Sequence, residues 1–262
     1  MLRCTFLSVG HGCAVVVETP SGRTLLFDAG SFADGSRATR IIASALWSRG
    51  CRGLDAVVLS HPDVDHYNGL PGLLERMPIG VVMSAQSFLD FAQRPVEDAC
   101  EAAARAGVPW RIIQAGDDLK FDPEVGCEVL HPAGTFASAE DNANSVVLRL
   151  TYAGRSLLLT GDLEGAGLQE LLRQEARPVD IMLAPHQGSV AANDRRLAAW
   201  AARVYVVLST GDAESLDRVR SRYDASSTLL STAQSGAVMF TITPSGDIAA
   251  DVMIGEKPAG KR

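Results

Sequence analysis

The chain has 262 residues, of which 47% are hydrophobic and 21% are charged, and its formal net charge is −7. No Pro- or Ser-rich linker divides it, so we expect one domain over residues 1–254 and a disordered tail at 255–262. The acidic balance excludes a protein that coats nucleic acid through Lys and Arg, but bound divalent ions could still support phosphodiester chemistry.

The first part of the chain is predicted to alternate strands and helices. Short apolar runs separated by turn-forming residues indicate consecutive antiparallel strands, and apolar residues at helical spacing indicate helices. In order, the predicted elements are strands at Leu2–Leu7, Ala14–Glu18 and Thr24–Phe27, a helix around Ile41–Leu46, a strand at Ala56–Leu59 and a helix at Gly69–Arg76.

The remainder continues the alternation. Residues 81–114 favour strand, helix and strand, since alanines at helical spacing give a face that lies close on a sheet. An apolar strand from Val179 ends on His186, much as the strand before Ser60 ends on His61. The other predicted elements are strands at Cys127–Leu130, Val146–Tyr152, Ser156–Thr160, Val204–Leu208 and Ala237–Thr243, a helix at Leu216–Arg222 and a last strand ending near Val252. Pattern alone predicts a mixed α and β domain.

Metal-binding residue types gather at Ser60–His66, directly after the apolar strand that ends at residue 59. In an extended segment alternate side chains share a face, so His61 and Asp63 can hold one ion while Asp65 and His66 turn towards a second. The alternative is a polar turn that happens to be rich in Asp. Two His that bracket two Asp behind a strand favour a metal site.

The motif HPDVDH resembles the HxHxDH signature of the metallo-β-lactamase superfamily, with Asp63 where the second His usually stands. Further blocks, up to about Ser189, resemble the hydrolase domain of ComEC-type DNA-uptake proteins: Val9–Gly12, Phe27–Gly30, Asn142–Ser145, Thr160–Asp162 and Pro185–Ser189. The resemblance implies a four-layer αββα sandwich of two mixed sheets. It also implies a hydrolase with two divalent cations, Zn²⁺ or Mn²⁺.

Motif matching assigns the first ion to His61 and Asp63, and the second ion to Asp65, His66 and His186. Asp162 matches the family's bridging carboxylate. The implied metal ligands are His61, Asp63, Asp65, His66, Asp162 and His186. A metal-bridging hydroxide would attack a phosphorus or carbonyl centre. Asp65 would orient the hydroxide, and His11 or Asn144 would contact the developing oxyanion.

Each assignment has a structural alternative. Asp162 can be an ordinary turn residue, and His186 can cap a core. Asp28 matches a family residue that fastens neighbouring loops, so we expect it to be structural. For His131, a ring nitrogen that bonds a nearby carbonyl is favoured over metal ligation, because the Asn142–Ser145 block takes the place of the additional ligand loop.

Three residues depart from the family pattern: His11 and Cys13 replace the Gln and Asp of VGQGD, and Gln187 replaces a second His. The region Ser209–Ala225 also lacks the family's Gly-His-Pro segment. The first functional hypothesis is a phosphodiesterase or nuclease acting on DNA or a smaller nucleotide. The second is a hydrolase of a lactone, lactam or thioester, since substrate choice lies in loops. The third is a noncatalytic metal-binding relative, which the three departures favour.

Two patterns bear on location. No apolar stretch approaches the ~18 residues needed to span a bilayer, and no signal peptide is recognised, so we expect a free-standing, soluble relative. The five cysteines form no CxxC pair, which is typical of reduced thiols in a cytoplasm. Oligomeric state is open.

Overall fold

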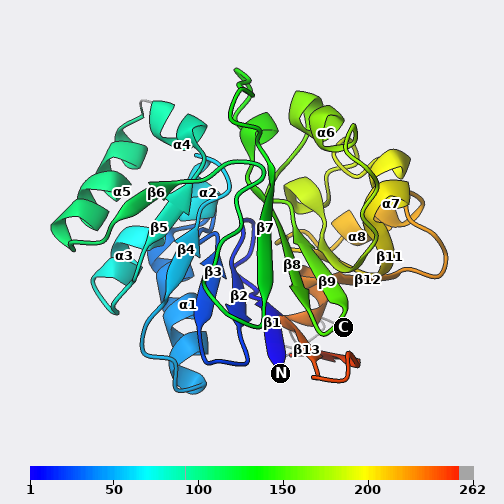
Figure 1. Cartoon of the computed structure of the whole chain (residues 1–262), viewed down its shortest axis with the longest axis horizontal. Coiled ribbons are helices and arrows are strands. Elements are labelled where there is room, and N and C mark those ends of the chain that lie inside the picture. The colour runs from blue at the N-terminus through cyan, green and yellow to red at the C-terminus, as the bar shows by residue number, and fades with distance from the viewer. Residues whose placement is uncertain (92, 254–262) are drawn as a thin grey trace, which may run out of the picture.

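Two β-sheets face each other in the computed structural model, which describes residues 1–91 and 93–253 (Figure 1). The tail expected at 255–262 lies outside the described residues. None of the described helices combines the length and apolar character that a bilayer crossing requires.

The first sheet has eight strands in the order β14-β13-β1-β2-β3-β4-β5-β6. It is antiparallel from β14 to β3 and parallel from β3 to β6, and is therefore mixed. Its strands are β1 (Leu2–Phe6), β2 (Val15–Glu18), β3 (Thr24–Phe27), β4 (Ala56–Val58), β5 (Val82–Ser84), β6 (Trp110–Ile112), β13 (Val238–Ile242) and β14 (Ile248–Val252).

The second sheet has six strands in the order β12-β11-β10-β9-β8-β7. Strands β9 to β12 are parallel, whereas β7, β8 and β9 are antiparallel. The predicted hairpin between β8 and β9 is confirmed, and Ala153 and Gly154 form its turn with positive φ angles. The strands are β7 (Gly126–His131), β8 (Val147–Tyr152), β9 (Arg155–Leu159), β10 (Val179–Leu183), β11 (Ala202–Leu208) and β12 (Thr228–Ser231).

Helices cover the outer face of each sheet, α1, α3 and α5 on one side and α6 and α7 on the other (Figure 1). The longest described helix, α1, is capped by Asp34, whose carboxylate accepts from the Ser36 N–H, and it buries Ala38, Ile42 and Leu46 at helical spacing. The helical segments are α1 (Gly35–Ser48), α2 (Val64–Tyr67), α3 (Leu70–Leu74), α4 (Gln86–Asp90), α5 (Arg94–Arg105), α6 (Gly165–Leu171), α7 (Arg195–Ala201), α8 (Ser215–Arg220), α9 (Thr232–Ser235) and the 3₁₀ turns Asn142–Asn144 and Pro185–Gly188.

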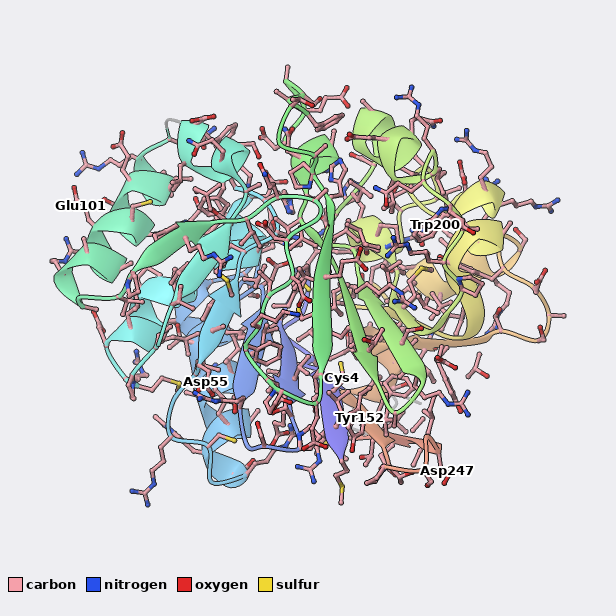
Figure 2. The ribbon with its side chains drawn as sticks, in the orientation of Figure 1. Cys4, Asp55, Glu101, Tyr152, Trp200 and Asp247 are labelled. Carbon is pink, nitrogen blue, oxygen red and sulfur yellow. The ribbon has the colours of Figure 1, made fainter. Side chains whose placement is uncertain are left out.

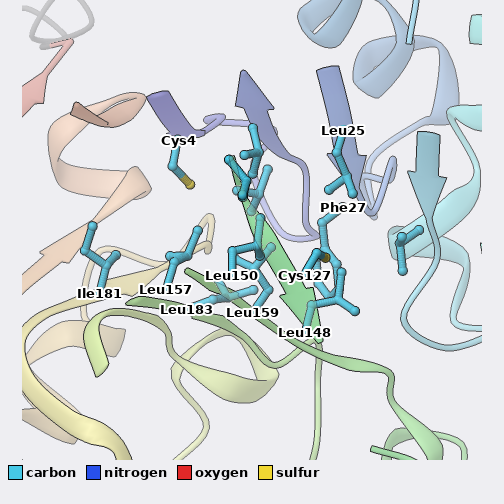
Figure 3. Close-up of a cluster of buried hydrophobic side chains, with 14 of the residues drawn as sticks. Cys4, Leu25, Phe27, Cys127, Leu148, Leu150, Leu157, Leu159, Ile181 and Leu183 are labelled. Carbon is cyan, nitrogen blue, oxygen red and sulfur yellow. The ribbon is translucent and has the colours of Figure 1, made fainter. Parts of the chain in front are cut away.

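Three clusters of buried hydrophobic side chains lie between the layers. Alternation along each strand divides side chains between faces: Leu25 and Phe27 point to the other sheet, while Leu26 packs under α1 and α3. In β9, Leu157 and Leu159 likewise join the central cluster and Leu158 joins the one under α6 and α7. Figure 3 shows the central cluster, with side chains of the two sheets directed towards each other. The predicted four-layer αββα sandwich is confirmed.

One local prediction was wrong in a way that affects the site. Residues 61–66 were expected to be extended, but Val64–Tyr67 form one helical turn, so Asp65 and His66 project from a helix and not from alternate strand positions. A four-residue turn is too short to show helical periodicity in sequence. Helices α6 and α7 and strand β12 were also missed.

Candidate metal centre

Both sheets contribute to the candidate site. His61 follows the carboxyl end of β4 in the first sheet, whereas Asp162 and His186 follow the carboxyl ends of β9 and β10 in the second. Asp65 and His66 come from α2, the turn after β4. The similarity of the segments before His61 and His186 therefore corresponds to one strand in each sheet.

The loops after β4 and β9 pack directly on each other. Gly161 has a φ of 54°, and a Cβ there would lie 2.6 Å from the Cβ of Ser60, so only glycine allows the approach. The Ser60 carbonyl accepts from the Val146 N–H over 2.8 Å, and the Gly161 carbonyl accepts from the His186 N–H over 3.2 Å. These contacts bring side chains a hundred residues apart into one cluster.

Three buried side chains form the centre of this cluster. Ligand atoms of His61, His66 and Asp162 all lie within 4.8 Å of one another, and the two imidazole rings are 4.2 Å apart. Nε2 of each histidine is buried without a hydrogen-bond partner among the described residues. Buried polar atoms are rarely left unpaired, so the two nitrogens with the facing carboxylate suit a divalent cation.

The electrostatics keep this cluster charged. Burial disfavours the carboxylate of Asp162, but the charge of His66, with those of His61 and His186, outweighs it and holds the pKa of Asp162 well below its usual range. Burial also opposes the imidazolium of His66, yet the Asp162 and Asp28 carboxylates raise the pKa of His66 well above its usual value. A cation at His66 Nε2 would take the place of that proton.

Asp28 orients the histidines from behind. Its carboxylate accepts from His66 Nδ1 over 2.8 Å and from the backbone N–H and hydroxyl of Ser60 over 2.7 and 2.8 Å. The same hydroxyl lies 2.9 Å from His61 Nδ1, so both rings direct Nε2 into the cluster. Asp28 thus fastens two loops, as expected. Burial, then the charge of Asp28, raises the pKa of the Cys13 thiol, which stays neutral at this position.

The other predicted ligands surround this centre. Oδ2 of Asp63 lies 3.3 Å from His61 Nε2, and that ring lowers the pKa of the Asp63 carboxyl. Nε2 of His186 lies 3.9 Å from Asp162 Oδ2, while its Nδ1 lies 2.8 Å from Glu164 Oε2. Asp65 reaches the cluster through a hydrogen bond from Gln187 over 2.9 Å. All six predicted ligands are brought together, and their binding of metal stays a prediction.

Three other candidates make contacts outside this set of ligands. His131 Nδ1 bonds the Ser145 carbonyl over 2.8 Å, and its Nε2 faces Glu170 at 3.1 Å. Asn144 uses its amide on backbone groups of residues 138 and 140, an arrangement that does not support the oxyanion contact predicted for it. His11 is exposed, with its ring edge-on to Phe32.

Sequence reasoning missed the partners of the ligands. Glu164, which fixes the ring of His186, lies two residues after Asp162 and carried no distinguishing pattern. Ser60 was read only as the start of the motif, although its hydroxyl contacts His61 and Asp28. Gln187 was noted as a departure, but its contacts with Asp65 were not foreseen.

A separate cavity of about 1030 Å³ lies at the other end of the first sheet. Arg49, Cys51 and Asp55 line it, and it includes no predicted site residue. Asp55 precedes β4, opposite the end that leads to His61 (Figure 2). The candidate metal centre is thus identified by its donor atoms and does not coincide with this cavity.

Residues 8–211 match the family model of the metallo-beta-lactamase superfamily. Among curated proteins, the chain is 30% identical over 250 residues to competence protein ComA of Neisseria gonorrhoeae, covering 92% of this chain and 32% of that protein. It is 27% identical over 197 residues to ComE operon protein 3 of Bacillus subtilis, covering 70% of this chain and 25% of that protein. The chain therefore spans a third or less of these relatives.

Solved structures show the same fold at low identity. The metallo-beta-lactamase fold protein YhfI of Bacillus subtilis superposes with a TM-score of 0.61 at 13% identity, covering 96% of this chain and 100% of that one. Zn²⁺-bound PqqB of Methylobacterium extorquens superposes with a TM-score of 0.53 at 14% identity, covering 87% and 97%.

Proposed function

This chain belongs to the metallo-β-lactamase superfamily, and on that premise we propose that it is a binuclear metal-dependent hydrolase, a phosphodiesterase or nuclease of the ComEC-like type. One observation carries the proposal: the unpaired Nε2 atoms of His61 and His66 meet the carboxylate of Asp162, which comes from the other sheet. Buried polar atoms left without a partner are costly, so this arrangement supports a bound cation.

The residues present fit two divalent ions. His61 and Asp63 would hold the first, Asp65, His66 and His186 the second, and Asp162 would face both. Imidazole and carboxylate ligands without thiolate suit Zn²⁺ and Mn²⁺. When bound, such ions activate water at neutral pH and polarise the bond to be cleaved.

The chain supplies orientation and charge around that chemistry. Asp28 and Glu164 hold the rings of His66 and His186 by Nδ1, which leaves each Nε2 directed inwards. Asp65 is half-buried and offers a carboxylate that can orient the attacking water. His11, exposed on the loop after β1, can donate to an oxygen of the substrate.

The proposal of a phosphodiester substrate rests on the ComEC-like resemblance and on the relatives, which are named competence protein ComA and ComE operon protein 3. The chain's net charge of −7 fits a substrate held mainly at the metal centre and not along a basic surface. Its five cysteines are all free, which supports placing the protein in a reducing cytoplasm.

The test is hydrolysis of bis(p-nitrophenyl) phosphate by the purified chain loaded with Mn²⁺ or Zn²⁺. We expect turnover that His61→Ala and Asp162→Ala reduce to background, while Asp55→Asn, at the opposite end of β4, retains it. Activity that survives both ligand substitutions would contradict the proposal.

A parallel substrate panel separates the alternatives. Turnover of lactones, lactams or thioesters without any phosphodiester cleavage would move the chain to the carbonyl-hydrolysing branch. A content well below one ion per chain, measured by elemental analysis, would instead indicate a noncatalytic relative.

A further inference from the structure

Gln187 places its side-chain amide between two carboxylates of the candidate centre. Its Nε2 donates to Asp65 Oδ2 over 2.9 Å and lies 3.4 Å from Asp162 Oδ2, while its Oε1 accepts from the Gly12 N–H over 3.0 Å. The side chain is only 7% exposed. A pair of N–H donors thus lies where two carboxylates converge, which is also where a cation would be attracted.

The orientation of this amide is fixed by its partners. A backbone N–H can only donate, so Oε1 must face Gly12 and the NH₂ group must face the carboxylates. Gly12 is packed closely against neighbouring backbone, because a Cβ there would lie 2.7 Å from the Asp65 carbonyl oxygen and 2.8 Å from that of Gly30. Rotating the amide to offer its oxygen to a cation would place the NH₂ group of Gln187 against the N–H of Gly12, so that two donors would face each other.

The backbone beneath Gln187 holds it in this place. His186 and Gln187 both have left-handed conformations, with φ of 48° and 51°, which non-glycine residues adopt only when their surroundings enforce it. Asn193 provides that enforcement through hydrogen bonds to the carbonyls of Pro185 and Ser189 over 2.8 and 2.7 Å. Asn193 is fully buried and accepts from the hydroxyl of Tyr223.

We propose that Gln187 makes the two metal positions unequal, by letting its amide stand in for the second cation between Asp65 and Asp162. The position at His61 and Asp63 meets this amide only through the longer contact with the shared Asp162, and it fills first. An ion that binds Asp65 must first displace the Gln187 amide from both carboxylates, so it enters second and more weakly. This inference rests on the proposed metal-dependent function and adds an order of loading to it.

Calorimetric titration of the metal-free protein with Mn²⁺, with bound metal counted after equilibrium dialysis, tests the proposal. We expect two separate steps, the second weaker by about tenfold or more, because hydrogen bonds to charged groups must be broken first. Gln187→Met keeps the length of the side chain but removes both donors, and it should tighten the second step about tenfold while leaving the first unchanged.

Two further variants control for packing. Gln187→Glu keeps an acceptor for the Gly12 N–H and adds a carboxylate, so it should also tighten the second step. Gln174→Met removes an amide that bonds the Leu130 carbonyl, outside the metal centre, and should titrate as the unaltered protein does. Two equal steps in the unaltered protein, or a second step that neither Gln187 variant tightens, would overturn the proposal. Failure of every variant and of the unaltered protein to bind any ion would overturn the proposed function with it.

Discussion

The carboxylate of Asp28 bonds Nδ1 of His66 over 2.8 Å, and neither side chain has exposed surface. Because an ionised carboxylate can only accept, a proton must lie on Nδ1, while Nε2 faces Asp162 and carries the second proton of the charged ring in the metal-free protein. This contact links a residue after β3 to a residue on α2 and sets how the ring meets the metal centre.

Replacing Asp28 by Asn should weaken metal binding by about 10- to 100-fold, because the ring of His66 loses its charged partner. Asparagine tolerates the left-handed backbone that Asp28 adopts at a φ of 57°, so the change keeps the backbone and removes the charge together with one acceptor oxygen. Competition against a fluorescent chelator measures the affinity. Asp55→Asn, which alters an Asp outside the centre, should leave it unchanged.

Metal binding should release protons near neutral pH. The raised pKa of His66 keeps its ring charged in the metal-free protein, and a metal ion at Nε2 displaces that proton. Calorimetry at pH 7 in buffers of different ionisation enthalpy should therefore give different apparent heats. Equal heats in all buffers would show that His66 is already neutral. His11→Ala removes an exposed histidine and should leave the release intact.

The same shift predicts how the metal-free protein responds to pH. Since the folded pKa of His66 lies above its unfolded value of 6.5, its stabilising contribution is complete below that value and is lost as pH rises through the folded pKa. The midpoint of thermal unfolding, measured from pH 6 upwards, should fall over that window for the unaltered metal-free protein. In His66→Gln this part of the fall should disappear.

Gly30→Ala should disrupt the centre without touching a ligand. A Cβ at this position would lie 2.2 Å from the Asp65 carbonyl and 2.4 Å from the His66 nitrogen, so α2 must shift. We expect metal affinity to fall by about tenfold or more in the same chelator competition. Gly107→Ala meets no neighbour and should cost only about 1–2 kcal/mol of backbone strain, with metal affinity unchanged.

The variant His131→Leu should show whether His131 has a structural role or binds metal. The number of ions per chain should stay the same, while urea unfolding should show a loss of about 1–3 kcal/mol, because the Ser145 carbonyl loses its partner. Elemental analysis counts the ions. Loss of one ion per chain would identify His131 as a ligand after all.

The cysteines should differ sharply in reactivity. Burial raises the pKa of the Cys127 thiol to about 12 and also raises those of Cys4 and Cys13, so these three should resist a thiol reagent at pH 8 in the folded protein. Cys51 and Cys100 are partly exposed and should be the two that react. All five should react in denaturant, and rapid native modification of Cys13 would contradict the packing behind His66.

Sequence patterns were sufficient for the strands that carry the centre. The run before His61 and the run before His186 are almost wholly apolar because both strands are buried on two faces, and such runs are legible without a structure. The resemblance to a known family then supplied what pattern could not, namely that the strands belong to two facing sheets.

The positions and orientations of the ligand side chains could not be predicted from the sequence. Asp65 and His66 lie on a helical turn that is fixed by the close approach of Gly30, a contact 35 residues away in sequence. The inward direction of Gln187 depends on two left-handed residues, a conformation that residue type disfavours and only tertiary contacts impose. Asn144 was predicted to contact an oxyanion because an amide that hydrogen-bonds within its own loop looks the same in sequence as one that faces a substrate.

The contact of Gly161 with Ser60 joins the loop that holds four of the six proposed ligands to a loop of the second sheet, which provides the other two. Neither sheet alone therefore supplies the complete set. A bound cation would therefore cross-link the two sheets, at the end of the sandwich where polar side chains take the place of the hydrophobic core. A low concentration of the ion would then lower the stability of the folded protein as well as its activity.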